Sequence, residues 1–409
     1  MNTKNCTNTG IRTSPARWTL LATSLVTLAA NQALLAGGFR LPDQDAFATA
    51  RGEAFAATAD NASAIYYNPA GLGQLRGNNF RGGFYSIWFQ SSYEAAGGQD
   101  WETDAKINPV PQLFYAYGCK DLPLTFGLGV YAPFGLSLKW PQDVPFRQIA
   151  LEGSLHYMTV NPAVAWRITP NLSLGAGLNI NRGEAMLKQG LAPVPLGDEF
   201  EFKGDGMSVS GNVGLQWQIN SNFTAGATYR GPSTLDMDGD IRIIPPFSTP
   251  FYDSANLDFH IPQSAVIGLS WRPNPRWNLE VDVEWTDWSS INSLQIKSAT
   301  PLPAVPLNWK ASYYYEFGVT RYFENGWHVS GGYVFNQSAM PDRYYNPVVA
   351  DVDKHFFSIG TGHRGKRWSF DVAYQIGYGP QHNVQGSTLA DGKYDFVSHA
   401  LSTTVGYNF

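Results

Sequence analysis

The chain has 409 residues, of which 15% are charged and 14% are aromatic, and its formal net charge at pH 7 is −5. Ordinary soluble proteins carry about 25% charged residues, so this composition argues against one, and the lack of a basic patch argues against a nucleic-acid partner. The mean hydropathy is slightly on the polar side, which excludes a bundle of apolar helices. The composition fits strands that turn one face to lipid and the other to a polar lumen. A secreted β-sandwich is the alternative.

Residues 1–36 have the three parts of a secretory signal peptide. Three basic residues precede an acid-free apolar run over residues 20–30, and small residues follow up to Ala36. The run is shorter than the roughly 20 residues that a membrane-spanning helix needs. We therefore predict export of the chain and cleavage after Ala36, which would leave Cys119 as a single thiol without a disulfide partner.

Residues 37–77 are rich in Ala, Gly and Asn and show no sustained alternation of apolar and polar residues. Residues 51–59 are expected to form a short helix, because Ala, Glu and Phe tolerate one. The motif Asn68-Pro69-Ala70 is expected to form a turn. A segment of this length ahead of a closed barrel can hang in the periplasm or fold back into the lumen as a plug.

From residue 78 onward, large apolar residues alternate with small or polar ones, which is the period of a β-strand. The clearest example is the C-terminal segment, in which Val397, Leu401, Val405, Tyr407 and Phe409 share one face. About fourteen strands are expected, over residues 78–92, 107–118, 122–135, 155–168, 171–188, 202–219, 222–241, 257–272, 277–297, 309–323, 326–340, 354–364, 368–379 and 393–409.

The connections between these expected strands alternate between short turns and longer stretches rich in Pro, Gly and Asp. Strict alternation of short periplasmic turns with long extracellular loops is typical of an outer-membrane barrel. We therefore predict an all-β fold in which residues 78–409 form a 14-stranded antiparallel transmembrane β-barrel. Three acids on one face of the ninth strand, Glu280, Asp282 and Glu284, are expected to line its polar lumen rather than to catalyse a reaction.

Several sequence blocks follow one another along the mature chain. They are Gly38-Phe39-Arg40-Leu41, Asp60-Asn61-Ala62-Ser63, Asn68-Pro69-Ala70-Gly71, Val160-Asn161-Pro162-Ala163, Ile261-Pro262-Gln263-Ser264 and Asp371-Val372-Ala373-Tyr374. In residues and in order, these blocks resemble the FadL family of outer-membrane transporters of hydrophobic compounds, which includes the toluene-type aromatic hydrocarbon channels. The resemblance covers essentially the whole mature chain.

The resemblance implies that residues 37–77 are a hatch (plug) inside the lumen of an outer-membrane barrel. It also implies passive uptake of long-chain fatty acids or similar hydrophobic molecules, which bind in an internal pocket and leave sideways through the wall at a kinked third strand. One alternative keeps this architecture and changes the cargo to aromatic or aliphatic hydrocarbons. Two others, an outer-membrane enzyme and a general porin, are disfavoured by the missing nucleophile motif and by the hatch.

The third expected strand contains Tyr131-Ala132-Pro133-Phe134-Gly135. Because proline cannot donate to a sheet ladder, it requires a bulge, an edge or a strand end. By resemblance to the family, these five residues form the lateral opening, and Asn68, Pro69 and Ala70 help to hold the hatch. The alternatives are that the strand simply ends at Ala132, and that the turn only packs against the lumen.

A fatty acid needs apolar walls and one cation for its carboxylate. Rough alignment with the family places Lys188 near an inward basic residue, and Phe39 and Leu41 at the start of the hatch are candidate contacts of the acyl chain. The alternatives are a loop-edge lysine and hatch core. The sequence contains no catalytic motif and no metal-ligand spacing, so no cofactor is expected, and the other expected partners are outer-membrane lipid and, through the terminal Phe409, the barrel-assembly machinery.

Overall fold

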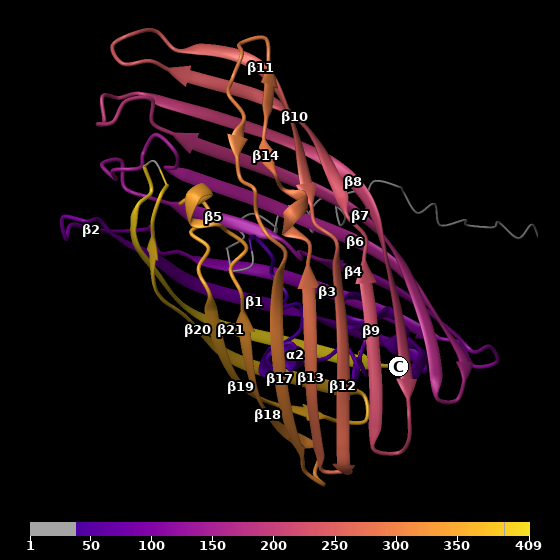
Figure 1. Ribbon diagram of the computed structural model, residues 1–409. Coiled ribbons are helices and arrows are strands. Elements are labelled where there is room, and N and C mark those ends of the chain that lie inside the picture. The colour runs from indigo at the N-terminus through magenta and orange to yellow at the C-terminus, as the bar shows by residue number, and fades with distance from the viewer. Residues whose placement is uncertain (1–37, 388) are drawn as a thin grey trace, which may run out of the picture.

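The computed structural model describes residues 38–387 and 389–409, so the expected signal peptide over residues 1–36 lies outside the described part of the chain. The described residues form a closed antiparallel barrel of 14 strands, as predicted (Figure 1). Pairing of the last strand with the first closes the cylinder. No helix among the described residues is long and apolar enough to cross a membrane.

Each position in the wall is filled by one strand or by two short strands in line. Around the barrel these are β1 (Gly77–Glu94), β3 (Ile107–Gly118), β4 (Leu124–Tyr131) with β5 (Gly135–Lys139), β6 (Glu152–Thr169), β7 (Leu172–Gln189), β8 (Glu199–Gln218), β9 (Phe223–Arg230) with β10 (Ser233–Ile244), β11 (Phe251–Ile261) with β12 (Ser264–Asn274), β13 (Trp277–Thr286), β17 (Ser312–Tyr322), β18 (Trp327–Asn336), β19 (Lys354–Arg364), β20 (Trp368–Val384) and β21 (Gly392–Asn408).

Short strands complete the long loops. β2 (Asp100–Glu102) pairs with β1, and β15 (Ile296–Ser298) pairs with β11. β14 (Ser293–Leu294) and β16 (Val305–Pro306) form a separate ribbon. These additions all lie at the end of the barrel that carries the long loops.

The period-two pattern of the strands separates an apolar outer face from a polar inner face. On β13, Val281 and Val283 are exposed outward, whereas Glu280 and Asp282, which alternate with them, are 1% exposed. Exposed tryptophans, among them Trp271, gather near the short turns. Such an arrangement matches an apolar band with an aromatic girdle at the membrane interface.

Four expected strands are interrupted in the structure, of which 222–241 divides into β9 and β10, and 257–272 into β11 and β12. The third expected strand does not run to residue 135: it breaks between β4 and β5, because Pro133 has no amide to continue the ladder. The expectation of one strand over residues 277–297 is wrong as well, since β13 ends at Thr286 and the chain turns inward through the short helix η3 (Trp288–Ser290). The fully buried side chain of Trp288 accounts for this turn, because its indole packs inside the barrel.

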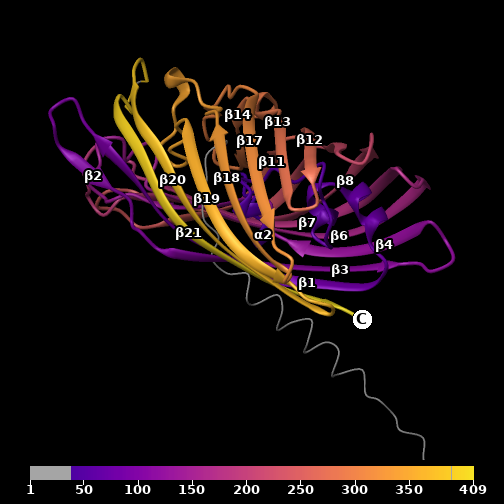
Figure 2. The same ribbon diagram turned by 90° about the horizontal axis from the view of Figure 1, so that it is seen from below.

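Residues 38–76, called the N-terminal segment below, lie inside the barrel (Figure 2). They contain α2 (Ala46–Ala50), α3 (Ala64–Tyr67) and the 3-10 helix η2 (Pro69–Gln74). α2 packs against β18 to β21, whereas η2 packs against β6, β7 and β8. The segment therefore crosses the lumen from one side of the wall to the other.

The expected helix over residues 51–59 is wrong. Helix α2 lies earlier in the chain, where Asp45 caps it by accepting hydrogen bonds from the backbone N–H groups of Phe47 and Ala48. It ends where Gly52 and Glu53 adopt positive φ angles of 59° and 62°, a conformation that an α-helix cannot contain. Helix propensity alone did not predict that the helix ends at this point.

Glycines on the inner wall let the backbone of the N-terminal segment lie directly against the strands. A Cβ atom at any of them would come within 2.6 Å of a main-chain or side-chain atom of the segment. They are Gly175, Gly214, Gly226, Gly318, Gly332 and Gly360, on six different strands. Close packing at six strands fixes the segment in one position, because protein interiors tolerate little overlap.

Candidate functional site

An apolar cavity of about 320 Å³ lies inside the barrel, near the long loops. Its walls come from Phe39 of the N-terminal segment, from β7, β8, β10 and β11, from the inward connection after β13 and from the loop around Asn346. Among its lining residues only Lys188, Gln189 and Asn346 are polar. A concave apolar chamber with a few polar groups is typical of a small-molecule site.

Phe39 lines this cavity and packs against a cluster of aromatic rings inside the barrel. Its ring lies 4.7 Å from that of Trp288, 5.2 Å from Phe259 and 5.8 Å from Phe134, centroid to centroid. Leu41, the other predicted acyl-chain contact, is fully buried in the same apolar cluster but does not line the cavity. The structure thus brings Phe39 to the cavity wall and places Leu41 behind it.

Lys188 borders the cavity, but the alternation along β7 turns its side chain to the outer face, because Ala185 is buried on the inner face whereas Arg182 is exposed. Its charge is balanced there by neighbouring acids. Its Nζ lies 3.0 Å from Oε2 of Glu201 and 3.8 Å from Oε2 of Glu152. Arg242, the next cation, pairs with Glu199 and Glu201. A carboxylate inside the cavity would therefore reach this ammonium group only if the Lys188 side chain left Glu201 and turned inward.

The break in the third strand is fastened to the N-terminal segment. The backbone N of Leu41 donates to O of Pro133 at 2.8 Å, and N of Gly135 donates to O of Phe39 at 2.9 Å. Between these bonds, Arg40 and Phe134 face each other as an antiparallel bridge. Residues 39–41 thus act as a short extra strand that holds the kink inside the barrel.

Beside the kink, the wall lacks a stretch of strand pairing. Residues 113–118 of β3 pair with β4, but residues 107–112 of β3 pair with β1 alone among the described residues. Pro109 and Pro111 lie in this stretch. Because proline has no N–H, it leaves fewer unpaired donors on a free edge, and unpaired donors are costly in lipid. The Pro-Val-Pro sequence was a signal for this edge that our sequence reasoning missed.

An apolar groove of about 500 Å³ runs along the outer wall next to the free stretch of β3. Its lining includes Phe80 and Phe84 of β1, which are 39% and 48% exposed on the outer face. Val130, Tyr131 and Ala132 line its other side. Of the predicted residues 131–135, Tyr131 and Ala132 therefore border an unpaired part of the wall within the apolar band.

The N-terminal segment is held by the inward acids of β13. Glu280 accepts hydrogen bonds from the backbone N of Ala57 at 2.7 Å and pairs with Arg51 at 3.0 Å. Asp282 accepts from the backbone N of Ala56 at 2.7 Å, and Glu284 pairs with Arg40. These acids face the lumen as predicted, but they bind the segment instead of lining an open channel.

Asn68 of the predicted hatch motif makes hydrogen bonds both within the N-terminal segment and to the barrel wall. Its Oδ1 accepts from the backbone N of Ala70 at 3.1 Å and caps η2. Its Nδ2 donates to O of Ala56 at 2.7 Å and to O of Leu215 in β8 at 3.0 Å. The side chain thus joins two parts of the segment to the wall.

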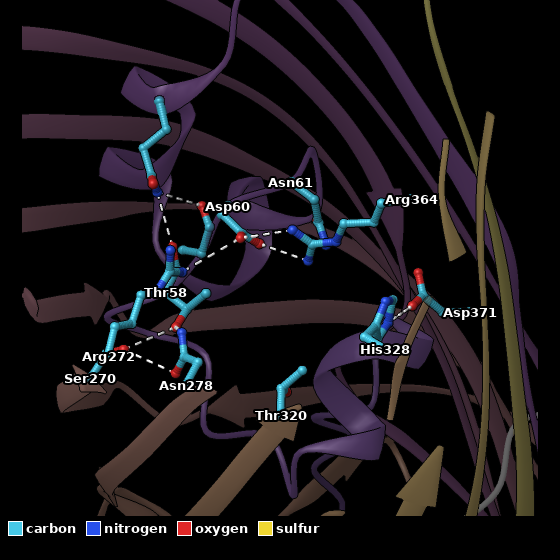
Figure 3. A network of polar contacts seen from close by, with 12 residues as sticks. Thr58, Asp60, Asn61, Ser270, Arg272, Asn278, Thr320, His328, Arg364 and Asp371 are labelled. Atoms are coloured by element: carbon cyan, nitrogen blue, oxygen red, sulfur yellow. Dashed lines mark hydrogen bonds and ion pairs between the residues drawn. The ribbon is translucent and has the colours of Figure 1, made fainter. Parts of the chain in front are cut away.

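A second group of polar contacts anchors the segment near the short turns (Figure 3). Asp60 accepts hydrogen bonds from both Nη atoms of Arg364, at 3.0 and 3.3 Å, and lies 3.6 Å from Nη2 of Arg272. Burial by itself would raise the pKa of Asp60, but these two guanidinium groups outweigh it and lower the pKa to about 2. Within the described residues, no group of three or more His, Cys, Asp or Glu side chains could hold a metal ion.

We expect Asp60→Asn to loosen this end of the N-terminal segment by about 1 kcal/mol, after allowing for partial solvent exposure of Arg364. Since the pKa of Asp60 is lowered, its ion pairs are present above the ordinary carboxyl pKa and are lost only as the pH falls toward about 2. The wild-type segment should therefore stay attached at mildly acidic pH. Limited proteolysis in detergent should cut the variant faster than the wild type, while Asp121→Asn, at an exposed turn, should change nothing.

Comparisons with known proteins agree with this architecture. The family model "Outer membrane protein transport protein (OMPP1/FadL/TodX)" matches residues 26–409. A long-chain fatty acid transport protein of Escherichia coli strain K12 is 22% identical over 404 residues, which cover 86% of this chain and 89% of that protein. A FadL homologue from Pseudomonas aeruginosa has a similar fold, with a TM-score of 0.82, 18% identity and coverage of 91% of this chain and all of the other. The Pseudomonas putida toluene transporter TodX has a TM-score of 0.73 at 18% identity, over 91% of this chain and 99% of the other.

Proposed function

Since its family model spans nearly the whole chain, the protein belongs to the OMPP1/FadL/TodX family of outer membrane transport proteins, and we propose that it takes up long-chain fatty acids without energy input. The observation that carries this proposal is the apolar cavity beside Phe39, together with the unpaired stretch of β3 beside the kink to which Phe39 is bonded. An acyl chain gains about 0.8 kcal/mol for each methylene that leaves water. Cavity, groove and bilayer are therefore successive apolar environments for it.

The proposed route couples the cavity to the wall through residues 39–41. Cargo that enters the cavity contacts Phe39, whose carbonyl accepts the bond from Gly135. Displacing Phe39 therefore loosens the kink, and the cargo leaves between β3 and β4 into outer-membrane lipid. Residues 131–135 are the lateral opening in this proposal, and Leu41 supports the kink instead of contacting the cargo.

In this proposal the N-terminal segment, the hatch of our sequence analysis, has a fixed part and a moving part. Residues from α2 to η2 are held by Glu280, Asp282 and Asn68 against the glycine-lined wall. Only the stretch around Phe39 moves, so no wide aqueous pore opens. The chain needs no cofactor and does no covalent chemistry, and its terminal Phe409 is recognised by the barrel-assembly machinery during biogenesis.

Uptake measurements test the proposal directly. Cells that lack their own transporter should take up labelled palmitic acid faster when they make this chain than when they carry an empty vector. The outcome against the proposal is equal uptake in both strains although the chain is present in the outer membrane.

The pairing of Lys188 with Glu201 and Glu152 favours a second candidate, in which the cargo is an uncharged aromatic or aliphatic hydrocarbon. Lys188→Met separates the two. If the cargo is a fatty acid whose carboxylate displaces Glu201, the apparent affinity for palmitic acid should fall about tenfold, because a charge-assisted hydrogen bond contributes about 1.5–3 kcal/mol. If the cargo is a hydrocarbon, uptake of hexadecane or toluene should be unchanged. Lys203→Met, on the exposed outer face of β8, is the matched control.

A further inference from the structure

Gln112 lies in the free stretch of β3, at the position where pairing with β4 stops. Its side chain is 3% exposed and points to the same side as Val110 and Phe114, which are fully buried. Neither Nε2 nor Oε1 of Gln112 has a hydrogen-bond partner among the residues that the structure describes. A buried amide with both of its polar atoms unpaired therefore stands at the edge of the wall opening.

Polar neighbours at the opening are occupied by one another. The hydroxyl of Tyr131 donates to Oδ1 of Asn161 at 3.1 Å and accepts from Arg230 at 3.2 Å. Gln44 donates to O of Ala132 and accepts from its N–H. Gln112 differs from these side chains, because neither of its polar atoms has a partner among the described residues.

Leaving a buried donor or acceptor unpaired costs about 1–3 kcal/mol. Such a group in a native protein calls for an explanation by a water, an ion or a ligand. Gln112 also lines the apolar groove on the outer wall, beside Pro111 and Leu113. The groove provides space for an apolar chain, and the amide provides one donor and one acceptor near its edge.

We propose that Gln112 binds the undissociated carboxyl group of a long-chain acid as the acid passes through the wall, while its tail lies in the outer groove. This inference rests on the proposed function and specifies the chemical form of its cargo. A neutral carboxyl group offers one O–H donor and one C=O acceptor, which match Oε1 and Nε2 of the amide. An ionised carboxylate offers acceptors only, and it would carry a charge into lipid at high cost. A hydrocarbon leaves both amide atoms unpaired.

The first test replaces the amide with an apolar side chain of similar size. Gln112→Leu should lower the rate of palmitic acid uptake about tenfold, as expected for the loss of one to two hydrogen bonds at the exit step. Asn108→Leu is the matched control, because Asn108 is equally buried on the same face of β3 but already donates to O of Lys106. This control should retain wild-type uptake. Equal loss in both variants, or no loss in Gln112→Leu, would overturn the proposal.

A second test uses the wild-type protein and does not depend on the variant's assembly. Palmitic acid labelled with ¹³C at the carboxyl carbon is bound to the purified chain in lipid nanodiscs, and difference infrared spectra are compared with those of protein-free nanodiscs. A protonated-carboxyl band that the protein shifts to lower frequency, and that Gln112→Asn alters, is the expected result. A bound label that is entirely carboxylate would refute this inference and leave the proposed function intact, whereas wild-type protein that neither binds nor transports palmitic acid would refute the proposed function itself.

Discussion

A disulfide between positions 40 and 134 is expected to stop transport while the barrel stays assembled. Arg40 and Phe134 form the bridge between the N-terminal segment and the kink, and the flanking bonds run from Leu41 to Pro133 and from Gly135 to Phe39. In this pattern the facing residues are a non-hydrogen-bonded pair, whose Cβ atoms lie about 4.5–5.5 Å apart. That separation overlaps the range that a disulfide accepts with a small adjustment.

Transport is expected to stop because the proposed route couples the movement of Phe39 to the opening of the wall at the kink. Cargo can leave through the wall only if residues 39–41 separate from residues 133–135, and a covalent link prevents this. The double variant Arg40→Cys/Phe134→Cys, in a Cys119→Ser background, should therefore show uptake of palmitic acid at least tenfold lower when oxidised, because the bond cannot be broken thermally on the timescale of transport.

Reduction of the purified or cell-surface protein should restore uptake to the level of the two single-cysteine variants. Those variants also report the effect of losing the Arg40 pair with Glu284. An oxidised double variant that transports at the same rate as its reduced form would contradict the coupling and favour a route that bypasses the kink.

The barrel itself could be predicted from the sequence because its signal is local. Alternation along each strand and alternation of turn lengths both repeat over the whole chain, so errors at single strands do not change the count. Strand ends were less predictable. Residues after Thr286 continue to include apolar side chains, and only the tertiary packing of Trp288 against Phe39 turns them inward.

The candidate site was predictable only in part. Resemblance to a family directed attention to Phe39, Lys188 and the kink; the structure places Phe39 on the cavity wall, and Lys188 at the border of the cavity with its side chain on the outer face. The partners of Lys188 come from two other strands, so they depend on register, which a sequence pattern does not fix to the residue. The position of Gln112 could not be predicted either, because it depends on where the pairing of β3 with β4 stops. Long-range pairing, and its absence, are not encoded locally.

The conformation of the N-terminal segment also could not be predicted from local sequence. Its composition suggested a helix over residues 51–59, but this stretch is shaped by contacts with the wall. Backbone N–H groups of Phe55 and Ala56 both donate to Asp282, more than 200 positions away. This distant acceptor replaces hydrogen bonds that a helix would have made, in keeping with the weakness of propensity as a predictor.

Two adjacent glycines of β18 offer a matched test of how the segment is seated. A Cβ atom at Gly332, on the inner face, would lie 2.0 Å from N of Gly52, whereas one at Gly331, on the outer face, would meet its nearest atom at 3.8 Å. Gly332→Val should therefore displace the segment at a cost of about 3 kcal/mol or more. Gly331→Val should be neutral or slightly stabilising, because valine suits an outward strand position.

The readout that separates these variants is ion conductance in planar bilayers. With the segment seated, the lumen is filled, and we expect low conductance from the wild type and from Gly331→Val. Gly332→Val should raise the time-averaged conductance by more than tenfold, since about 3 kcal/mol shifts a two-state population by over a hundredfold. Heat-modified migration on gels confirms that each barrel has assembled. Equal conductance from the two assembled variants would mean that the wall adjusts around the new side chain, and the seating of the fixed part of the hatch would then have to be assigned to its polar contacts with Glu280 and Asp282.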